Sequence, residues 1–232
     1  DWTHGFTGDR ISDPWNINDQ GELHILTETI QNGNECNIWA GDPGIAGGDI
    51  TINFDVECNS GGRDGAEGVN FGVFFYAEAP GLRDDGGTGI HNVAIEWIDG
   101  PVDQRPGSSG LQGLFYNPGR SIADHLTGTG DGEPPREWWV TVEEIVAIGV
   151  TRVRMWGDGV QYLDFNVGHS QVQPTGHVGM WAWVQDVEIC IDNFEVISGI
   201  EEPPPNGDGV GPFLRGDPNS DGKTNLPDAQ HI

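Results

Sequence analysis

Residues 50–58 alternate strictly between apolar and polar side chains. Isoleucine, phenylalanine, valine and cysteine occupy every second position, and threonine, asparagine, aspartate and glutamate stand between them. Successive side chains of an extended strand point to opposite faces, so this pattern predicts a strand with one face in a core. An amphipathic helix needs apolar residues three and four apart, a spacing that is not evident before the last twenty residues. The chain is therefore expected to be all-β.

Comparable segments recur along the chain, separated by stretches dense in Gly, Pro, Asp and Ser. The further strands expected are residues 21–27, 69–79, 91–99, 110–116, 137–143, 150–156, 160–167, 179–184 and 187–197. Gly157-Asp158-Gly159 predicts a hairpin turn between two of them. Many short strands joined by turns are typical of an antiparallel two-sheet sandwich or jelly roll. We expect one such domain over residues 1–198, with residues 50–58 beside residues 187–197 and a turn-rich start over residues 1–20.

Several segments also carry a family resemblance. In order they are WNINDQGELHI, GDITINFDVE, VNFGVFFYAE, RVRMWGDGVQYLDF and GHVGMWAWVQDVEICIDNFEV. This order resembles the concanavalin A-like jelly rolls of the laminin-G-like and 3-keto-disaccharide hydrolase-like families. The resemblance implies a concave face that in relatives often handles carbohydrate. It departs from the hydrolase-like family at Ala94, where an acidic residue is expected, and this argues against catalysis.

The segment DPNSDGKTNLPD, residues 217–228, has the spacing of an EF-hand-type calcium loop. Gly222 stands at the sixth position, where such a loop turns sharply. Calcium prefers six to eight oxygen ligands, and this loop offers oxygen ligands only. The expected Ca²⁺ ligands are Asp217, Asn219, Asp221, the Lys223 carbonyl, Asn225 and Asp228. The alternative is a metal-free surface turn rich in Asp, Asn and Gly.

The same residues, GDPNSDGKTNLPDAQHI, resemble one calcium-binding repeat of a dockerin, a module that attaches secreted bacterial proteins to scaffolds. Dockerins carry two such repeats, whereas this sequence ends four residues after Asp228. Either the sequence is truncated or a lone repeat serves another use. We expect residues 213–232 to be a single, partial dockerin-like repeat. Residues 199–212, GIEEPPPNGDGVGP, are expected to be a Pro/Gly-rich linker.

The formal net charge is -27, and Lys223 is the only lysine. Nucleic acid and anionic membrane surfaces are poor partners for such a chain, whereas divalent cations and neutral glycans are compatible with it. The acidic composition and the calcium loop favour a secreted, extracellular or cell-surface protein. The three cysteines match no zinc pattern. A Cys58–Cys190 disulfide is expected if Phe54 lies opposite Phe194; a Cys36–Cys58 bridge and three free thiols are the alternatives.

Three residues are candidates for carbohydrate binding: Glu96, Trp139 and Trp181. Glu96 and Asp99 could supply a catalytic acid and base, but on an extended strand they point to opposite faces and cannot pair directly. Each could equally be an ordinary surface carboxylate. Trp181 shares a strand face with Trp183. The two rings could form a stacking platform for sugars or belong to the core.

Trp139 shares its strand face with Thr141 and Glu143, whereas Trp138 lies with the apolar Val140 and Val142. Trp139 is therefore the better candidate for an exposed binding aromatic. His91 and His125 are weaker candidates for a base, with His125 placed in a long loop. No residue is assigned a catalytic role.

Two functions remain open. In the first, the protein is a secreted, non-catalytic structural or binding module. It would join a protein partner or copies of itself through the calcium-loaded C-terminal repeat, with carbohydrate as a further ligand. In the second, it is a secreted glycan-active hydrolase with a dockerin-like targeting tail.

Overall fold

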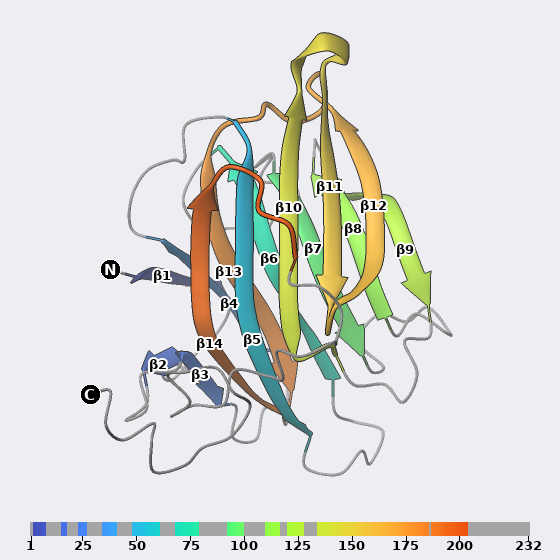
Figure 1. Cartoon of the computed structure of the whole chain (residues 1–232). Coiled ribbons are helices and arrows are strands. Elements are labelled where there is room, and N and C mark those ends of the chain that lie inside the picture. The colour runs from blue at the N-terminus through green and yellow to red at the C-terminus, as the bar shows by residue number, and fades with distance from the viewer. Residues whose placement is uncertain are drawn as a thin grey trace, which may run out of the picture.

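The computed structural model describes residues 2–7, 15–17, 23–26, 34–40, 48–60, 68–78, 92–99, 110–116, 120–127, 134–185 and 187–203. These residues form two antiparallel sheets packed face to face, as the two layers of strands in Figure 1 show. The architecture is the β-sandwich that the alternating segments predict. Residues 204–232, which carry the expected calcium loop, lie outside the described ranges.

Within the described residues, each sheet contains seven strands. The first, sheet A, has the order β1 (Trp2–Thr7), β4 (Asn34–Ala40), β13 (His177–Gln185), β6 (Gly68–Ala77), β7 (Asn92–Asp99), β8 (Gly110–Tyr116) and β9 (Arg120–Thr127). The second, sheet B, has the order β12 (Val160–Gly168), β11 (Val150–Gly157), β10 (Glu137–Ile145), β5 (Ile50–Ser60), β14 (Val187–Ser198), β3 (Leu23–Leu26) and β2 (Trp15–Ile17).

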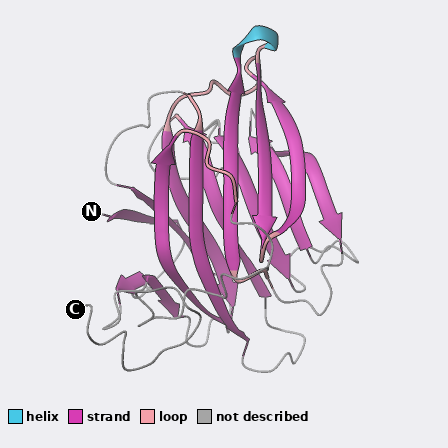
Figure 2. Cartoon of the chain, in the orientation of Figure 1, coloured by secondary structure: helices cyan, strands magenta, loops and turns pink. Residues whose placement is uncertain are grey.

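One 3₁₀ turn, η1 (Val146–Ile148), caps the β10–β11 hairpin and is the only helical element in the described ranges (Figure 2). Among these residues there is no helix with the length and apolar character to cross a bilayer.

The core lies between the sheets and follows from the alternation. In β5, Ile50, Ile52 and Phe54 are at most 2% exposed. Trp138 of β10 packs its ring 5.1 Å from that of Phe54 and 5.5 Å from that of Phe71 in the other sheet, measured between ring centroids. Burying one such large apolar side chain contributes on the order of 1.5–3 kcal/mol, so this contact ties the two sheets together.

The expected neighbours β5 and β14 do pair, and a two-residue turn at Asp158 and Gly159 joins β11 to β12 as expected. Both turn residues have positive φ, 48° and 74°, as a type I′ hairpin turn requires.

The register expected from Phe54 opposite Phe194 holds only from Glu195 onward, because β14 contains a bulge between Asp192 and Glu195. From Asp192 back to Val187 the register is shifted by one residue, so Cys58 pairs with Ile189 and Cys190 with Glu57. The two cysteines therefore do not stand opposite each other as the expected disulfide required.

Two further expectations need correction. The turn-rich start contains strands β1 and β2, and residues 120–127, expected to lie in a long loop, form strand β9. Strand β9 pairs with β8 through a register shift between Gly113 and Leu114. A bulge breaks the alternation, which is the reason that the sequence pattern conceals this strand.

Candidate functional site

The candidate residues divide between the two sheets. Glu96 lies on β7 and Trp181 on β13, both in sheet A, whereas Trp139 lies on β10 in sheet B. The three residues proposed for carbohydrate binding therefore do not form one site. Each face has to be considered by itself.

The register of sheet A places Glu96 and Trp181 in one cross-strand row. Trp181 pairs with Gly72, Gly72 with Glu96, and Glu96 with Gln112. A side chain at Gly72 would collide with the backbone carbonyl oxygen of Ile95, so glycine permits the close approach of β6 and β7 here. The register thus leaves a single glycine between the two candidates.

Glu96 is fully buried in this row, and its Oε2 accepts a hydrogen bond of 2.7 Å from Nε2 of Gln112. Its neighbours Ala94 and Leu114 are at most 1% exposed, although they lie outside the main core in a second cluster with Phe74. This face is therefore closed to solvent around Glu96. The side chain of Trp181 lies outside the described part of the structure.

The outer face of sheet B carries a more accessible arrangement. Trp139 of β10 and Trp156 of β11 are direct cross-strand partners, and both are half-buried. Directly opposed residues of an antiparallel pair have Cβ atoms about 4.5–5.5 Å apart, so the two indoles form one aromatic surface. We call Trp139 and Trp156 the tryptophan platform. Asn53 and Gln161 continue the same row on the flanking strands.

Arg154 borders the platform. Its guanidinium carbon lies 5.3 Å from the centroid of the Trp156 ring, within the range of a cation–π contact. Its Nη2 lies 3.6 Å from Oε2 of Glu143, and its side chain is 18% exposed. The Nε of Arg154 is buried and has no hydrogen-bond partner within the described ranges. One donor beside the platform is thus unused.

Thr141 adds a second unused polar group. It is the cross-strand partner of Arg154 and is 1% exposed, and its hydroxyl has no hydrogen-bond partner among the described residues. Leaving a buried polar group unpaired costs about 1–3 kcal/mol. An aromatic pair with a polar side chain at its edge is typical of a ligand-binding surface, where a few polar groups orient a ligand on apolar walls. Arg154 is such a side chain, whereas the Thr141 hydroxyl is closed to solvent and is not available to a ligand.

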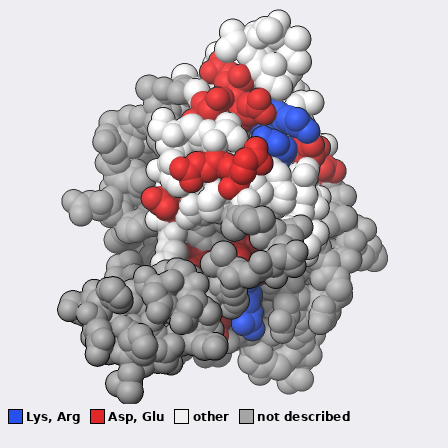
Figure 3. Space-filling view, in the orientation of Figure 1, with Lys and Arg blue, Asp and Glu red and all other residues white. Residues whose placement is uncertain are grey.

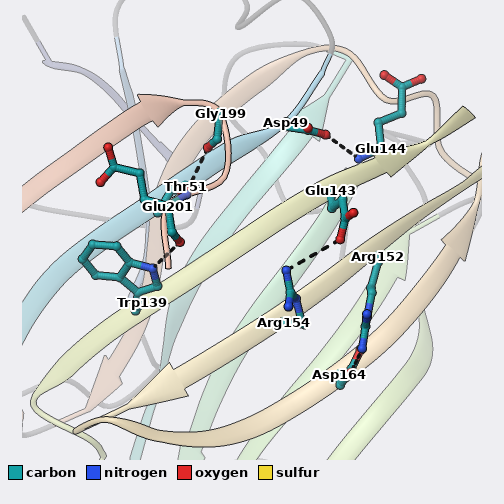
Figure 4. Close-up of polar contacts among 10 residues, drawn as sticks. All are labelled: Asp49, Thr51, Trp139, Glu143, Glu144, Arg152, Arg154, Asp164, Gly199 and Glu201. Carbon is teal, nitrogen blue, oxygen red and sulfur yellow. Dashed lines mark hydrogen bonds and ion pairs between the residues drawn. The ribbon is translucent and has the colours of Figure 1, made fainter. Parts of the chain in front are cut away.

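Charges of both signs surround the platform. Arg152 binds Asp164 through two hydrogen bonds, from Nε and Nη2 (Figure 4). This contact holds the pKa of the Asp164 carboxyl below its usual range. Figure 3 shows a blue patch of basic side chains beside a larger group of acidic ones on the face drawn. Arg152 and Arg154 each face a carboxylate, so the positive charge of both arginines is compensated.

The segment after β14 lies on this face. Residues 199–203 cross β5 and reach β10, as Figures 1 and 4 show. Thr51 donates a hydrogen bond of 2.9 Å to the carbonyl of Gly199 and accepts one of 2.8 Å from the Glu201 backbone N–H. Nε1 of Trp139 donates to the Glu201 carbonyl at 3.1 Å. One edge of the platform is therefore in contact with this segment.

The sequence singled out Trp139 but not Trp156. Alternation along β10 separates Trp139 from the core residues Trp138 and Val140. The importance of Trp156 depends on the β10–β11 register, which a short hairpin turn and outward alternation on β11 could have suggested. The proposed calcium ligands lie outside the described ranges. Within those ranges, no group of three or more His, Cys, Asp or Glu side chains is placed to hold a metal ion.

Comparisons of the sequence find no matching protein family and no matching curated protein. The fold does match solved structures. A protein of unknown function with a galectin-like fold from Bacillus subtilis has a TM-score of 0.59 and 13% identity, covering 87% of this chain and 91% of that one. The exoplasmic/lumenal domain of VIP36 in its Ca²⁺-bound form has a TM-score of 0.56 and 14% identity, with coverages of 87% and 85%.

The seed lectin of Lotus tetragonolobus has a TM-score of 0.50 and 14% identity, with coverages of 87% and 94%. At these identities the matches establish the fold alone. The chain shares the jelly-roll fold of these proteins, in agreement with the concanavalin A-like class that the sequence resembles.

Proposed function

We propose that this protein is a non-catalytic carbohydrate-binding module and that a glycan binds to the tryptophan platform on sheet B. The observation that carries the proposal is the direct pairing of two half-buried tryptophans on an accessible sheet face. Sugar rings present apolar C–H faces that stack on aromatic rings, and their hydroxyl groups need hydrogen-bond partners at the edges. Trp139 and Trp156 supply the first requirement, and the Arg154 guanidinium beside Trp156 and the exposed Gln161 on β12 supply the second.

The fold matches are consistent with this ligand class. VIP36 has been solved with Man₃GlcNAc, and a lectin from Ulex europaeus with the methyl glycoside of α-L-fucose. These ligands belong to those proteins, and they support a glycan as the class of ligand for this fold without placing the site.

The proposal assigns no catalytic step to the platform. Hydrolysis of a glycosidic bond uses two carboxyl groups, one of which must stay protonated to act as an acid. Asp164, on the strand next to Trp156, binds Arg152. This arginine partner lowers the pKa of the Asp164 carboxyl, so Asp164 is not suited to donate a proton.

We further propose that the module is secreted and that residues 213–232 bind Ca²⁺ and join it to a protein partner or to further copies of itself. The support is the oxygen-ligand spacing from Asp217 to Asp228, together with the acidic composition. Residues 1–198 would be the sandwich, with the linker and the calcium repeat following it.

An array of neutral and acidic glycans tests the binding function. The native chain should retain a defined set of glycans, and Trp156→Ala should weaken binding to that set by at least about 10-fold, because buried aromatic anchors contribute more than about 1–2 kcal/mol to recognition. Ile148→Ala, at the far tip of the β10–β11 hairpin and 70% exposed, is the matched control and should bind like the native chain. Equal binding by Trp156→Ala and the native chain would rule out the platform.

A further inference from the structure

Residues 199–203, which we call the strap, are held on the sandwich by a closely spaced set of hydrogen bonds. Besides the two bonds through Thr51 and the one from Trp139, the Gly199 N–H donates to the Asp49 carbonyl at 2.7 Å. Asp49 is itself tied to β10, since its Oδ1 accepts a bond of 2.8 Å from the Glu144 N–H. The strap is thereby connected to both β5 and β10.

Thr51 is the centre of this attachment. Alternation places it on the outer face of β5, between the core residues Ile50 and Ile52, yet it is completely buried. Its single hydroxyl acts as donor to one strap residue and acceptor from another. Because the one hydrogen of the hydroxyl is donated to the strap and its oxygen also accepts a bond from the strap, the strap and Thr51 hold each other in place.

The strap also acts on the tryptophan platform. An indole on the surface of a sheet can rotate about two side-chain bonds, and an ordered partner for Nε1 removes much of that freedom. The Glu201 carbonyl is such a partner for Trp139. The same contact places the strap on the β5 side of the platform, whereas Trp156, Arg154 and Gln161 lie toward β12.

We infer that the strap is part of the glycan site: it orients the Trp139 ring and closes the platform toward β5, so that a neutral glycan lies over Trp139 and Trp156 and extends toward Gln161 on β12. This inference rests on the proposed function. It assigns a positioning role to Thr51 and to residues 199–203, the first part of the expected linker. Neutral sugars fit this surface because both platform arginines already face carboxylates.

Thr51→Val tests the inference, because valine keeps the branched shape of threonine and removes both hydrogen bonds to the strap. Thr141→Val is its matched control. Thr141 is the direct cross-strand partner of Thr51 and equally buried, but its hydroxyl has no partner within the described ranges. A general effect of removing a buried hydroxyl from this row would appear in both variants.

The first measurement is hydrogen exchange of the Trp139 indole N–H by NMR, with the signal assigned by its loss in Trp139→Phe. Thr51→Val should accelerate this exchange by about 3- to 10-fold, the range expected when a hydrogen bond of ordinary net strength is lost. Thr141→Val should leave it unchanged. Unaltered exchange in Thr51→Val overturns the orienting role of the strap.

The second measurement is the affinity of each variant for the neutral oligosaccharide that the native chain retains most strongly on the array, by calorimetry. Thr51→Val should weaken binding by about 3- to 10-fold, and Gln161→Ala should weaken it as well, whereas Thr141→Val should not weaken it. Should Thr51→Val not fold, Trp139→Phe takes its place, since it keeps an aromatic ring and removes the N–H bonded to Glu201.

The possible failures are distinguishable. If Trp156→Ala abolishes binding while Thr51→Val and Trp139→Phe bind like the native chain, the strap inference is wrong and the platform stands. If Gln161→Ala has no effect, the proposed direction of the glycan is wrong. If the native chain retains no glycan, the proposed function fails, and the exchange measurement still decides whether the strap orients Trp139.

Discussion

Acidic residues concentrate where β5, β10 and β14 meet on sheet B. Asp55 pairs with Glu137 on one side and with Asp192 on the other, and Asp158 lies beside them at the β11–β12 turn. Burial raises the pKa of the Asp55 and Glu137 carboxyls, and the neighbouring carboxylates raise it further. Asp158 also has a structural use, since its carboxylate accepts hydrogen bonds from the backbone N–H groups of Arg136 and Glu137.

Neutralising Glu137 should therefore stabilise the protein at neutral pH. A folded-state pKa above the unfolded value means that the folded chain holds the proton more strongly. The stabilisation is complete below the unfolded pKa and is lost as the pH rises through the folded pKa. Glu137→Gln avoids that loss and should raise the Tm at pH 7 by up to about 2–4 °C, as relief of a like-charge cross-strand pair of up to about 1 kcal/mol implies.

The difference between Glu137→Gln and the native chain should shrink in thermal melts near pH 4 and below, where the glutamate is protonated. Glu57→Gln removes the same formal charge from an exposed position on β5 and is the control. A stabilisation of equal size in both variants at pH 7 would attribute the effect to net charge rather than to the Asp55–Glu137 pair.

At the scale of the elements, alternation was sufficient where one strand face meets the core and the other meets solvent. It located β5, β10, β11 and β12 to within a few residues, and it separated Trp139 from Trp138. The strands β6 and β7 of sheet A do not show this alternation, because they are buried on both faces and carry long apolar runs.

The register between neighbouring strands could not be predicted from the sequence. A single extra residue in β14 moves the cysteines out of line, and the cross-strand position of Trp156 depends on how β10 and β11 are aligned. The burial of Glu96 could not be predicted without the sheet A register, which pairs Glu96 with Gly72 on one side and Gln112 on the other. The sequence therefore indicated candidate side chains, whereas the topology determined which of them meet.

The bulge in β14 is encoded locally. Asn193 has a φ of 53°, and asparagine tolerates this left-handed conformation better than most residues. Its backbone N–H donates to Asp192, its side chain donates to Asp55, and Phe194 beyond it packs its ring 5.9 Å from that of Phe54. The sequence Asp192-Asn193-Phe194 thus supplies the left-handed residue of the bulge, a hydrogen bond to β5 and a ring contact with Phe54.

Replacing Asn193 with alanine should destabilise the sandwich by about 1–2 kcal/mol, because alanine is strained at this φ and cannot bond Asp55. Urea unfolding followed by tryptophan fluorescence measures the loss. Asn193→Gly removes the same side-chain bond but relieves the backbone strain, so it should be less harmful than alanine. Equal destabilisation by the two variants would show that the left-handed conformation is not the controlling factor.

At the scale of the whole molecule, a net charge of -27 opposes close association of copies of this chain. The strap lies on the face that carries the tryptophan platform (Figure 1). A partner joined through residues 213–232 would thus be tethered from the same side as a bound glycan. Calcium in that segment would reduce the negative charge of the tail and so weaken the repulsion that association must overcome.

The last prediction concerns that segment as an assembly element. Ordering a loop of about twelve residues costs on the order of 1–2 kcal/mol per residue in backbone entropy. One calcium ion would gather the oxygen ligands, but the apolar Leu214, Leu226 and Ile232 need a surface to cover them, and so short a segment has no core of its own. A neighbouring copy or a partner protein can supply that surface, and a head-to-tail contact that does not close would propagate as a fibre.

Light scattering of the native chain, 25.0 kDa as a monomer, should show larger species in calcium that disperse on adding a chelator. Deleting residues 213–232 should abolish the calcium response, and so should Asp217→Ala, which keeps the length of the chain and removes one proposed ligand. Both variants should retain glycan binding, because the platform and the strap lie within residues 134–203. If the variant that lacks residues 213–232 associates in calcium to the same degree as the full chain, and attaches equally well to its native surroundings, the assembly role is wrong. If only the attachment is lost, residues 213–232 bind a separate receptor rather than further copies of the module.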